Sequence, residues 1–177
     1  TSIVFLKTDG EWLEAKVYYS STLLDGESGG FTTQDIALDG LTYVWSLDNA
    51  YGWKASGFVN NTNKETESWL ISPEIDLGKA VAPVMKFDVA INFLKGQKVE
   101  DYFSVNISTD YSGDATTATW ETLSITGWPE GTNWSFVTIE GIDMSAYVGQ
   151  KIHLGFLYKS DSKAAPTVEI QDLSIQE

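Results

Sequence analysis

Hydrophobic and polar residues alternate one by one along several stretches of this chain. The alternation is clearest over residues 85–94, and it recurs over residues 103–108 and 152–159. Successive side chains of a β-strand point to opposite faces, so a period of two residues predicts strands that bury one face in a core. Thr, Val, Tyr, Phe and Trp, which strands favour, are frequent in these runs. In the longest run the residues predicted to face the core are Met85, Phe87, Val89, Ile91 and Phe93.

Clusters of turn-forming residues separate these runs at intervals typical of strands. Residues 60–63, 110–114 and 128–131 are examples, each rich in Gly, Asn, Asp, Ser or Pro. The sequence contains no convincing amphipathic helix. The chain is therefore predicted to be all-β, with its strands packed as an antiparallel sandwich.

The first residues have a pattern of their own. Apolar runs at 3–7 and 11–17 flank Thr8-Asp9-Gly10, and Asp-Gly is the turn chemistry of a tight β-hairpin. An isolated hairpin is marginally stable in water, so this one must pack on the sandwich or end a preceding domain. We expect residues 1–17 to be a hairpin from a preceding segment and residues 18–177 to form the sandwich domain.

The last strand shifts its alternation by one residue. Val168 and Ile170 share one phase, whereas Leu173 and Ile175 share the other, and the slip falls at Gln171-Asp172. A β-bulge at this point would account for the slip. Such a bulge either bends the strand around the sandwich or redirects a side chain at a site.

Charge and composition exclude several classes of function. The 177 residues hold 11 basic residues, all of them Lys, against 25 Asp and Glu, which gives a net charge of −14. That field repels nucleic acid and anionic membranes. The chain has no Cys, no Gly-rich loop for nucleotide phosphates, and no apolar run long enough for a transmembrane segment. We therefore expect no nucleic acid, nucleotide or membrane span among its partners.

Two features suggest catalysis, and neither makes a convincing site. Gly26-Glu27-Ser28-Gly29-Gly30 is close to the sequence around the nucleophile of chymotrypsin-like proteases, but the only histidine, His153, follows the serine instead of preceding it. His153 also alternates with apolar neighbours, which predicts a solvent-facing strand residue. The many carboxylates single out no glycosidase pair. An enzyme acting on glycosides is thus the least favoured of the functions considered.

Aromatic residues are the strongest functional signal, with 7 Trp, 8 Tyr and 8 Phe. An aromatic ring can stack on the apolar face of a sugar while nearby polar groups bind its hydroxyls. Trp128 and Trp53 are predicted to be loop-edge rings of this kind, with Tyr51 and Asp48 beside Trp53. The tryptophans expected in the core or in strand packing are Trp45, Trp69, Trp120 and Trp134.

Six spaced stretches resemble one domain family. The first includes Ser68-Trp69-Leu70-Ile71-Ser72-Pro73, which is similar to the "esWLiSPaidL" signature of choice-of-anchor J domains. Those domains are similar to cleaved-adhesin domains and, more distantly, to MAM-type jelly rolls. The resemblance extends from about Tyr18 to the end. The stretches that carry it are 67–77, 84–88, 105–113, 119–123, 142–152 and 168–173.

The resemblance implies a galactose-binding-like or MAM-like jelly-roll sandwich without catalytic activity. It also implies a secreted or cell-surface protein of Bacteroidetes-like bacteria, often part of an outer-membrane lipoprotein. Relatives can hold a structural calcium ion between an acidic residue near the first strand and an Asp pair in the last. Here Ser21 and Gln171 replace two of those positions and only Asp172 matches, so a calcium ion at Ser21 and Asp172 is left open. No other cofactor is expected.

These observations together predict a non-catalytic binding or adhesion module. The favoured hypothesis is glycan contact through Trp128, Trp53, Tyr51 and Asp48. The alternative is a structural spacer, or an adhesion domain that binds a host or surface protein.

Overall fold

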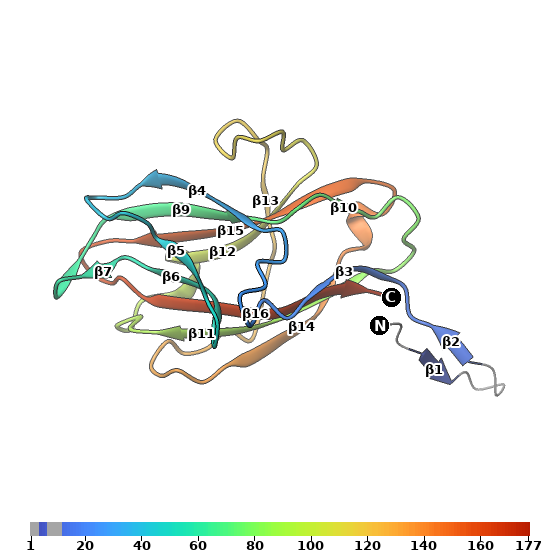
Figure 1. Ribbon diagram of the computed structural model, residues 1–177, viewed down its shortest axis with the longest axis horizontal. Coiled ribbons are helices and arrows are strands. Elements are labelled where there is room, and N and C mark those ends of the chain that lie inside the picture. Colours follow the sequence, from blue (N-terminus) through green and yellow to red (C-terminus); the bar gives the residue numbers. More distant parts are fainter. Residues whose placement is uncertain (1–3, 7–11) are drawn as a thin grey trace.

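Two six-stranded antiparallel sheets stack face to face in the computed structural model, which describes residues 4–6 and 12–177 (Figure 1). We name each sheet after its central strand. The β15 sheet has the order β13 (Glu121–Thr122), β12 (Phe103–Ser108), β15 (Lys151–Ser160), β9 (Thr66–Ile71), β4 (Thr32–Ala37), and β10 (Ile75–Asp76) also pairs with β15. The β16 sheet has the order β14 (Val137–Asp143), β11 (Val84–Asn92), β16 (Thr167–Gln176), β6 (Gly52–Ser56), β5 (Trp45–Asp48), and β3 (Val17–Ser21) also pairs with β16.

The remaining elements are short. Two hairpins, β1 (Val4–Leu6) with β2 (Trp12–Glu14) and β7 (Phe58–Val59) with β8 (Thr62–Asn63), accompany the 3₁₀ turns η1 (Val99–Asp101) and η2 (Ser145–Tyr147). No helix among the described residues is long and apolar enough to cross a membrane. The predicted all-β jelly-roll sandwich, preceded by a short hairpin, is confirmed.

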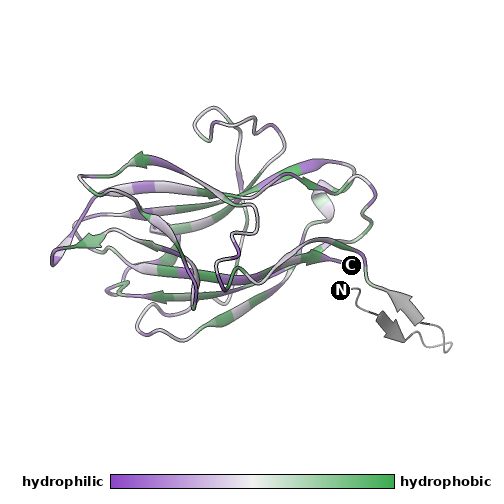
Figure 2. Ribbon diagram, in the orientation of Figure 1, coloured by the Kyte–Doolittle hydropathy of each residue, from purple (hydrophilic) through white to green (hydrophobic). Residues whose placement is uncertain are grey.

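The core lies between the two sheets and follows the predicted alternation. Met85, Phe87, Val89 and Ile91 of β11 are fully or almost fully buried, and Figure 2 shows the same change of hydropathy along the strands. Burying one such side chain stabilises a fold by about 1.5–3 kcal/mol, so inward-facing positions dominate the stability of this sandwich.

Phe93 departs from the prediction that it faces the core. Its φ angle is 63°, in the left-handed region, and this local reversal ends β11. Leu94 takes the inward position with 2% of its surface exposed, whereas Phe93 is 45% exposed. The period of two therefore stops one residue earlier than the pattern of apolar residues suggests.

The predicted bulge in the last strand is confirmed. Lys86 of β11 pairs with Ser174 and Asp88 pairs with Gln171, so β16 contains one residue more than its partner between these pairs. Asp172 has a φ angle of 55° at this point. The extra residue allows Val168 and Ile170 before it to face the same core as Leu173 and Ile175 after it.

The N-terminal hairpin pairs as predicted, with Val4 opposite Glu14 and Leu6 opposite Trp12. Its Asp9-Gly10 turn lies outside the described residues. Val17 already belongs to the β16 sheet, because it pairs with Gln176, and Lys16 and Glu177 exchange two backbone hydrogen bonds. The expected assignment of residues 1–17 to a preceding segment stays a prediction.

Tyr158 provides a test of the core. Its hydroxyl donates to the carbonyl oxygen of Pro166 at 2.5 Å and accepts from the backbone N–H of Gly57 at 2.9 Å, and the side chain is fully buried. Tyr158→Phe leaves both backbone groups without this partner, so we expect the free energy of unfolding to fall by about 1–3 kcal/mol in urea denaturation. Tyr43→Phe, at a residue 58% exposed, is the control, and equal effects of the two changes would contradict the prediction.

Candidate functional site

The outer face of the β16 sheet places polar side chains side by side on three neighbouring strands. Strand register aligns Ala90 of β11, Glu169 of β16, Lys54 of β6 and Ser46 of β5 in one row. The neighbours of Glu169 along the strand, Val168 and Ile170, are fully buried in the core. Because side chains alternate, the row containing Glu169 faces outward.

Three neighbouring hollows lie over this face and share lining residues, and we call them together the β16 groove. The first, of about 600 Å³, is lined by the 40–48 segment, Lys54, Ser56, Lys64 and the β7–β8 hairpin. The second, of about 170 Å³, shares Phe58 with the first. The third, of about 340 Å³, shares Lys54 with the first and is lined also by Tyr51, Trp134 and Glu169. The groove thus joins polar strand residues to a rim of loops.

Exposed aromatic side chains gather around the β16 groove. Within residues 15–177, whose side chains the structure describes, every Phe, Trp or Tyr that stands out as exposed lines one of the three hollows. Each comes from a different segment of the chain. They are Tyr43 at 58% exposure, Tyr51 at 51%, Phe58 at 50%, Trp134 at 49% and Phe93 at 45%.

A tight turn between β5 and β6 holds Tyr51 at the rim. The Oδ1 atom of Asp48 accepts hydrogen bonds from the backbone N–H groups of Ala50 at 2.8 Å and Tyr51 at 3.0 Å. Gly52 has a φ angle of 87°, and a Cβ atom there would collide with the carbonyl oxygen of Ile170. Only glycine allows this close approach to β16, so the turn that presents Tyr51 has a fixed shape.

The loop before β14 holds Trp134 against the end of β11. The backbone N–H of Leu94 donates to the carbonyl oxygen of Gly131 at 3.0 Å. The ring of Trp134 packs edge-on against Phe93, with 5.5 Å between centroids, and the Lys95 ammonium lies 5.6 Å from the Phe93 ring centre. The left-handed turn at Phe93 therefore builds one side of the rim.

Glu169 is the most unusual polar residue of the groove. Only 2% of its surface is exposed, and among the described residues its carboxylate makes neither a hydrogen bond nor an ion pair within 4.0 Å. Burial raises the pKa of this carboxyl, an effect that the positive charge of Lys54 opposes and the negative charge of Asp48 reinforces. A buried carboxylate without a partner destabilises a fold, and such groups concentrate at functional sites.

Two of the four residues predicted to bind a ligand line the β16 groove, namely Tyr51 and Asp48. Trp53 is not a loop-edge ring. It lies within β6, is 8% exposed, and its indole N–H donates to the carbonyl oxygen of Ser28 at 3.0 Å.

Trp128 is not free at a loop edge either. It is half-buried, and its ring packs 5.5 Å from Phe103 and 6.3 Å from Phe87, because the loop that carries it folds back onto the core. Neither Trp53 nor Trp128 thus offers the open ring face that the prediction required.

The other tryptophans divide differently from the prediction. Trp45 and Trp69 are buried as expected, and Trp120 stacks on Trp69 with 4.6 Å between ring centroids. Trp134 was expected in the core or in strand packing, and this expectation is wrong, since it is 49% exposed and lies outside the strands. The sequence holds a signal for it, because Gly127, Pro129, Gly131 and Asn133 make the preceding residues a chain of turns.

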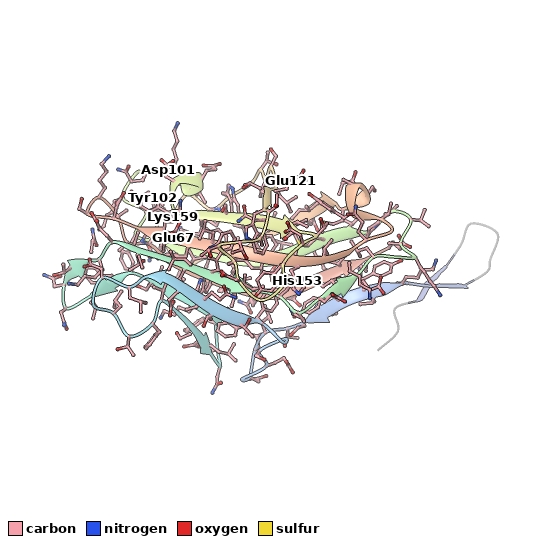
Figure 3. The ribbon with its side chains drawn as sticks, turned by 90° about the horizontal axis from the view of Figure 1, so that it is seen from above. Glu67, Asp101, Tyr102, Glu121, His153 and Lys159 are labelled. Carbon is pink, nitrogen blue, oxygen red and sulfur yellow. The ribbon has the colours of Figure 1, made fainter. Side chains whose placement is uncertain are left out.

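The loop that follows β12 covers part of the outer face of the β15 sheet, where Tyr111 lies against His153 and Trp120 lies against Trp69. Figure 3 looks onto this sheet and labels His153, Glu67 and Lys159 on it. His153 faces outward as predicted but is half-buried, since the Tyr111 ring lies 4.7 Å from it, and burial lowers the pKa of its imidazole. Glu67 and Lys159 form an ion pair at 3.6 Å. These residues make a packed surface instead of a groove.

The residues suggested for calcium do not make a suitable cage. Ser21 pairs with Leu173, so Ser21 and Asp172 come to neighbouring strands. The Ser21 hydroxyl already accepts from the N–H of Leu23 at 3.1 Å, and Asp172 is exposed. No group of three His, Asp or Glu side chains that could hold a metal occurs among the described residues. Calcium requires six to eight oxygen ligands, and this donor set does not fit it.

No protein-family model and no curated protein matches the chain. The fold is similar to that of solved structures of binding domains. The K1 cleaved adhesin domain of Lys-gingipain from Porphyromonas gingivalis W83 has a TM-score of 0.53 and 16% identity, over 88% of this chain and 95% of that domain. The carbohydrate recognition domain of Emp46p has a TM-score of 0.55 and 12% identity, over 92% of this chain and 98% of that one.

A structure described as carbohydrate-binding modules from the β-sandwich superfamily has a TM-score of 0.50 and 14% identity, over 99% of this chain and 72% of that one. At such identities the likeness establishes the fold alone. It confirms that the chain has a cleaved-adhesin-like sandwich, which is also the fold of carbohydrate recognition domains.

The substitution Glu169→Gln tests whether the charge of Glu169 destabilises the folded protein. A carboxyl whose pKa is raised in the folded state stabilises the fold below its unfolded pKa, and this contribution is lost as pH rises through the folded pKa. At pH 7 we therefore expect Glu169→Gln to be more stable than the wild type, by about 1 kcal/mol, because an unpartnered buried charge is removed.

The difference in the free energy of unfolding is expected to shrink as pH falls towards 4. Urea denaturation at several pH values measures it. Glu67→Gln, which removes a carboxylate paired with Lys159 at 3.6 Å, is the matched control and should gain no stability at pH 7. A loss of stability in Glu169→Gln at pH 7 would show that the carboxylate has a stabilising partner.

Adding a chelator tests the conclusion that Ser21 and Asp172 do not hold a calcium ion. A bound ion at a hundred times its Kd stabilises a protein by about 2.7 kcal/mol, which a melting experiment detects readily. We expect the melting temperature to be the same in calcium and in EDTA. A clear drop in EDTA would reveal an ion site that the donor geometry does not suggest.

Proposed function

We propose that this domain is a non-catalytic module that binds glycans in the β16 groove. One observation carries the proposal: five exposed aromatic side chains from five separate segments line the neighbouring hollows of the β16 groove, together with polar strand residues. A sugar presents an apolar C–H face and a ring of hydroxyls, so it needs aromatic and polar groups together. Scattered exposed rings would need no such explanation, whereas this grouping does.

The contacts of Asp48 favour a role without catalysis. The carboxylates that line the groove belong to Glu169 and Asp48. A glycosidase uses both of its carboxyl groups at the bond that is cleaved. The Asp48 carboxylate instead accepts two hydrogen bonds from the backbone of its own turn.

The comparisons and the sequence motifs both support a binding module. Solved domains of this fold include a carbohydrate recognition domain and a cleaved adhesin domain. The resemblance to choice-of-anchor J domains suggests a secreted or surface location, in an outer-membrane lipoprotein of Bacteroidetes-like bacteria. In that setting residues 1–17 would be the end of a preceding segment. The surface partner would be a glycan, and a host or surface protein is the alternative.

The direct test is a screen of oligosaccharides followed by calorimetry. We expect the wild type to bind at least one glycan and expect Trp134→Ala and Tyr51→Ala each to weaken it about tenfold, as loss of a central aromatic contact does. Ile36→Ala, which removes an apolar side chain 42% exposed on β4 of the other sheet, is the control. Binding by none of the glycans, or binding unaffected by the aromatic changes, would favour a spacer or a protein-binding domain.

A further inference from the structure

We propose that the β16 groove recognises an uncharged sugar through two adjacent hydroxyl groups that bridge Glu169 and Lys54. This inference rests on the proposed function and assigns the chemistry of the recognised unit. It starts from the floor of the groove, where these two residues lie directly opposite each other on neighbouring strands.

Glu169 and Lys54 are placed for an ion pair and do not form one. Among the described residues neither charge has an opposite charge within 4.0 Å, although Lys16, Lys151 and Lys159 all do. Both side chains line the third hollow, together with Tyr51 and Trp134. The carboxylate of a residue that is only 2% exposed therefore lacks a hydrogen-bond donor beside a hollow that is also lined by an ammonium group and two aromatic rings.

The Glu169 carboxylate and the Lys54 ammonium group have complementary hydrogen-bonding capacities. An ionised carboxylate only accepts hydrogen bonds and an ammonium group only donates them. A hydroxyl group does both, so a pair of neighbouring hydroxyls can donate to Glu169 and accept from Lys54 at once. Hydrogen bonds to charged groups are the stronger kind, and a desolvated site increases their value. The apolar face of the same sugar ring could then stack on Tyr51 or Trp134.

The surrounding charges select against anionic ligands. A sugar carboxylate or sulfate at this place would meet Glu169, with Asp48 nearby raising the negative potential. A sugar amine would pair with Glu169 but would leave the Lys54 ammonium group without an acceptor and would be repelled by it. The residue opposite Glu169 on its other side is Ala90, which leaves the space open without adding a charge. An uncharged unit is the one that satisfies both groups and is repelled by neither.

Calorimetry with matched ligands tests this inference. Neutral trisaccharides that bind the wild type are compared with their uronate counterparts of the same linkage. We expect the neutral form to bind at least tenfold more tightly. Glu169→Gln and Lys54→Gln should each weaken the neutral ligand about tenfold. The double variant should lose clearly less than the product of the two single losses, since both residues bind the same hydroxyls.

The controls separate this inference from the function on which it rests. Glu67→Gln removes a carboxylate on the opposite sheet and should leave the affinity unchanged. Urea denaturation of each variant confirms that it is folded. If the wild type binds no glycan, the proposed function fails. If Trp134→Ala abolishes binding while Glu169→Gln or Lys54→Gln does not weaken it, or if the uronate form binds as tightly, only the present inference is overturned.

Discussion

The contact between the two sheets is the constraint on which the rest of the structure depends. Phe156 of β15 takes part in this contact, with its ring centroid 5.7 Å from that of Phe87 in the other sheet and 6.0 Å from that of Phe103 in its own sheet. These rings and their buried neighbours fix which face of every strand turns inward. Because the side-chain period is two, the same choice fixes the outer face. Val168 and Ile170 cannot be buried without Glu169 facing the β16 groove.

The stability of the core permits a destabilising arrangement at the groove. Glu169 and Lys54 stand opposite each other without pairing, and only 2% of the surface of Glu169 is exposed. If stability alone shaped this face, an apolar or hydrogen-bonded residue at position 169 would serve better. Features that oppose folding and are retained in a well-packed frame are typical of binding and catalytic sites.

The sequence predicts the framework of this fold better than its rim. The alternation in β11, β12, β15 and β16, and the bulge at Asp172, follow from the period of hydrophobic residues, because burial decides these positions. The exposed position of Phe93 could not be predicted in this way. Phe93 continues an apolar pattern, and only a left-handed backbone turn at that residue sends its ring outward.

Tertiary contacts determine which of the loop tryptophans is buried and which is exposed. Trp128 follows a glycine and precedes a proline, as an exposed loop ring would, but the core offers it Phe87 and Phe103. Trp134, six residues later in the same loop, contacts Phe93 at the surface instead. Turn-forming residues surround both tryptophans, so the sequence predicts a loop there but not which of the two rings packs on the core. Of the predicted site, Tyr51 and Asp48 are placed in the groove by a turn that their own sequence specifies through Gly52.

The inward positions fix the fold, whereas the exposed residues around the groove are free to differ. Domains that share this fold can therefore bind different ligands. The domain has only 12–16% identity with solved cleaved adhesin and carbohydrate recognition domains, yet the sandwich is the same. Inward positions need only be apolar and of suitable size, so sequences can diverge widely while the sheets keep their packing. The groove, in contrast, takes its rings from five segments and its polar floor from single outward residues. The ligand of this domain must therefore be argued from residues of the groove such as Glu169 and Trp134 and not from the fold.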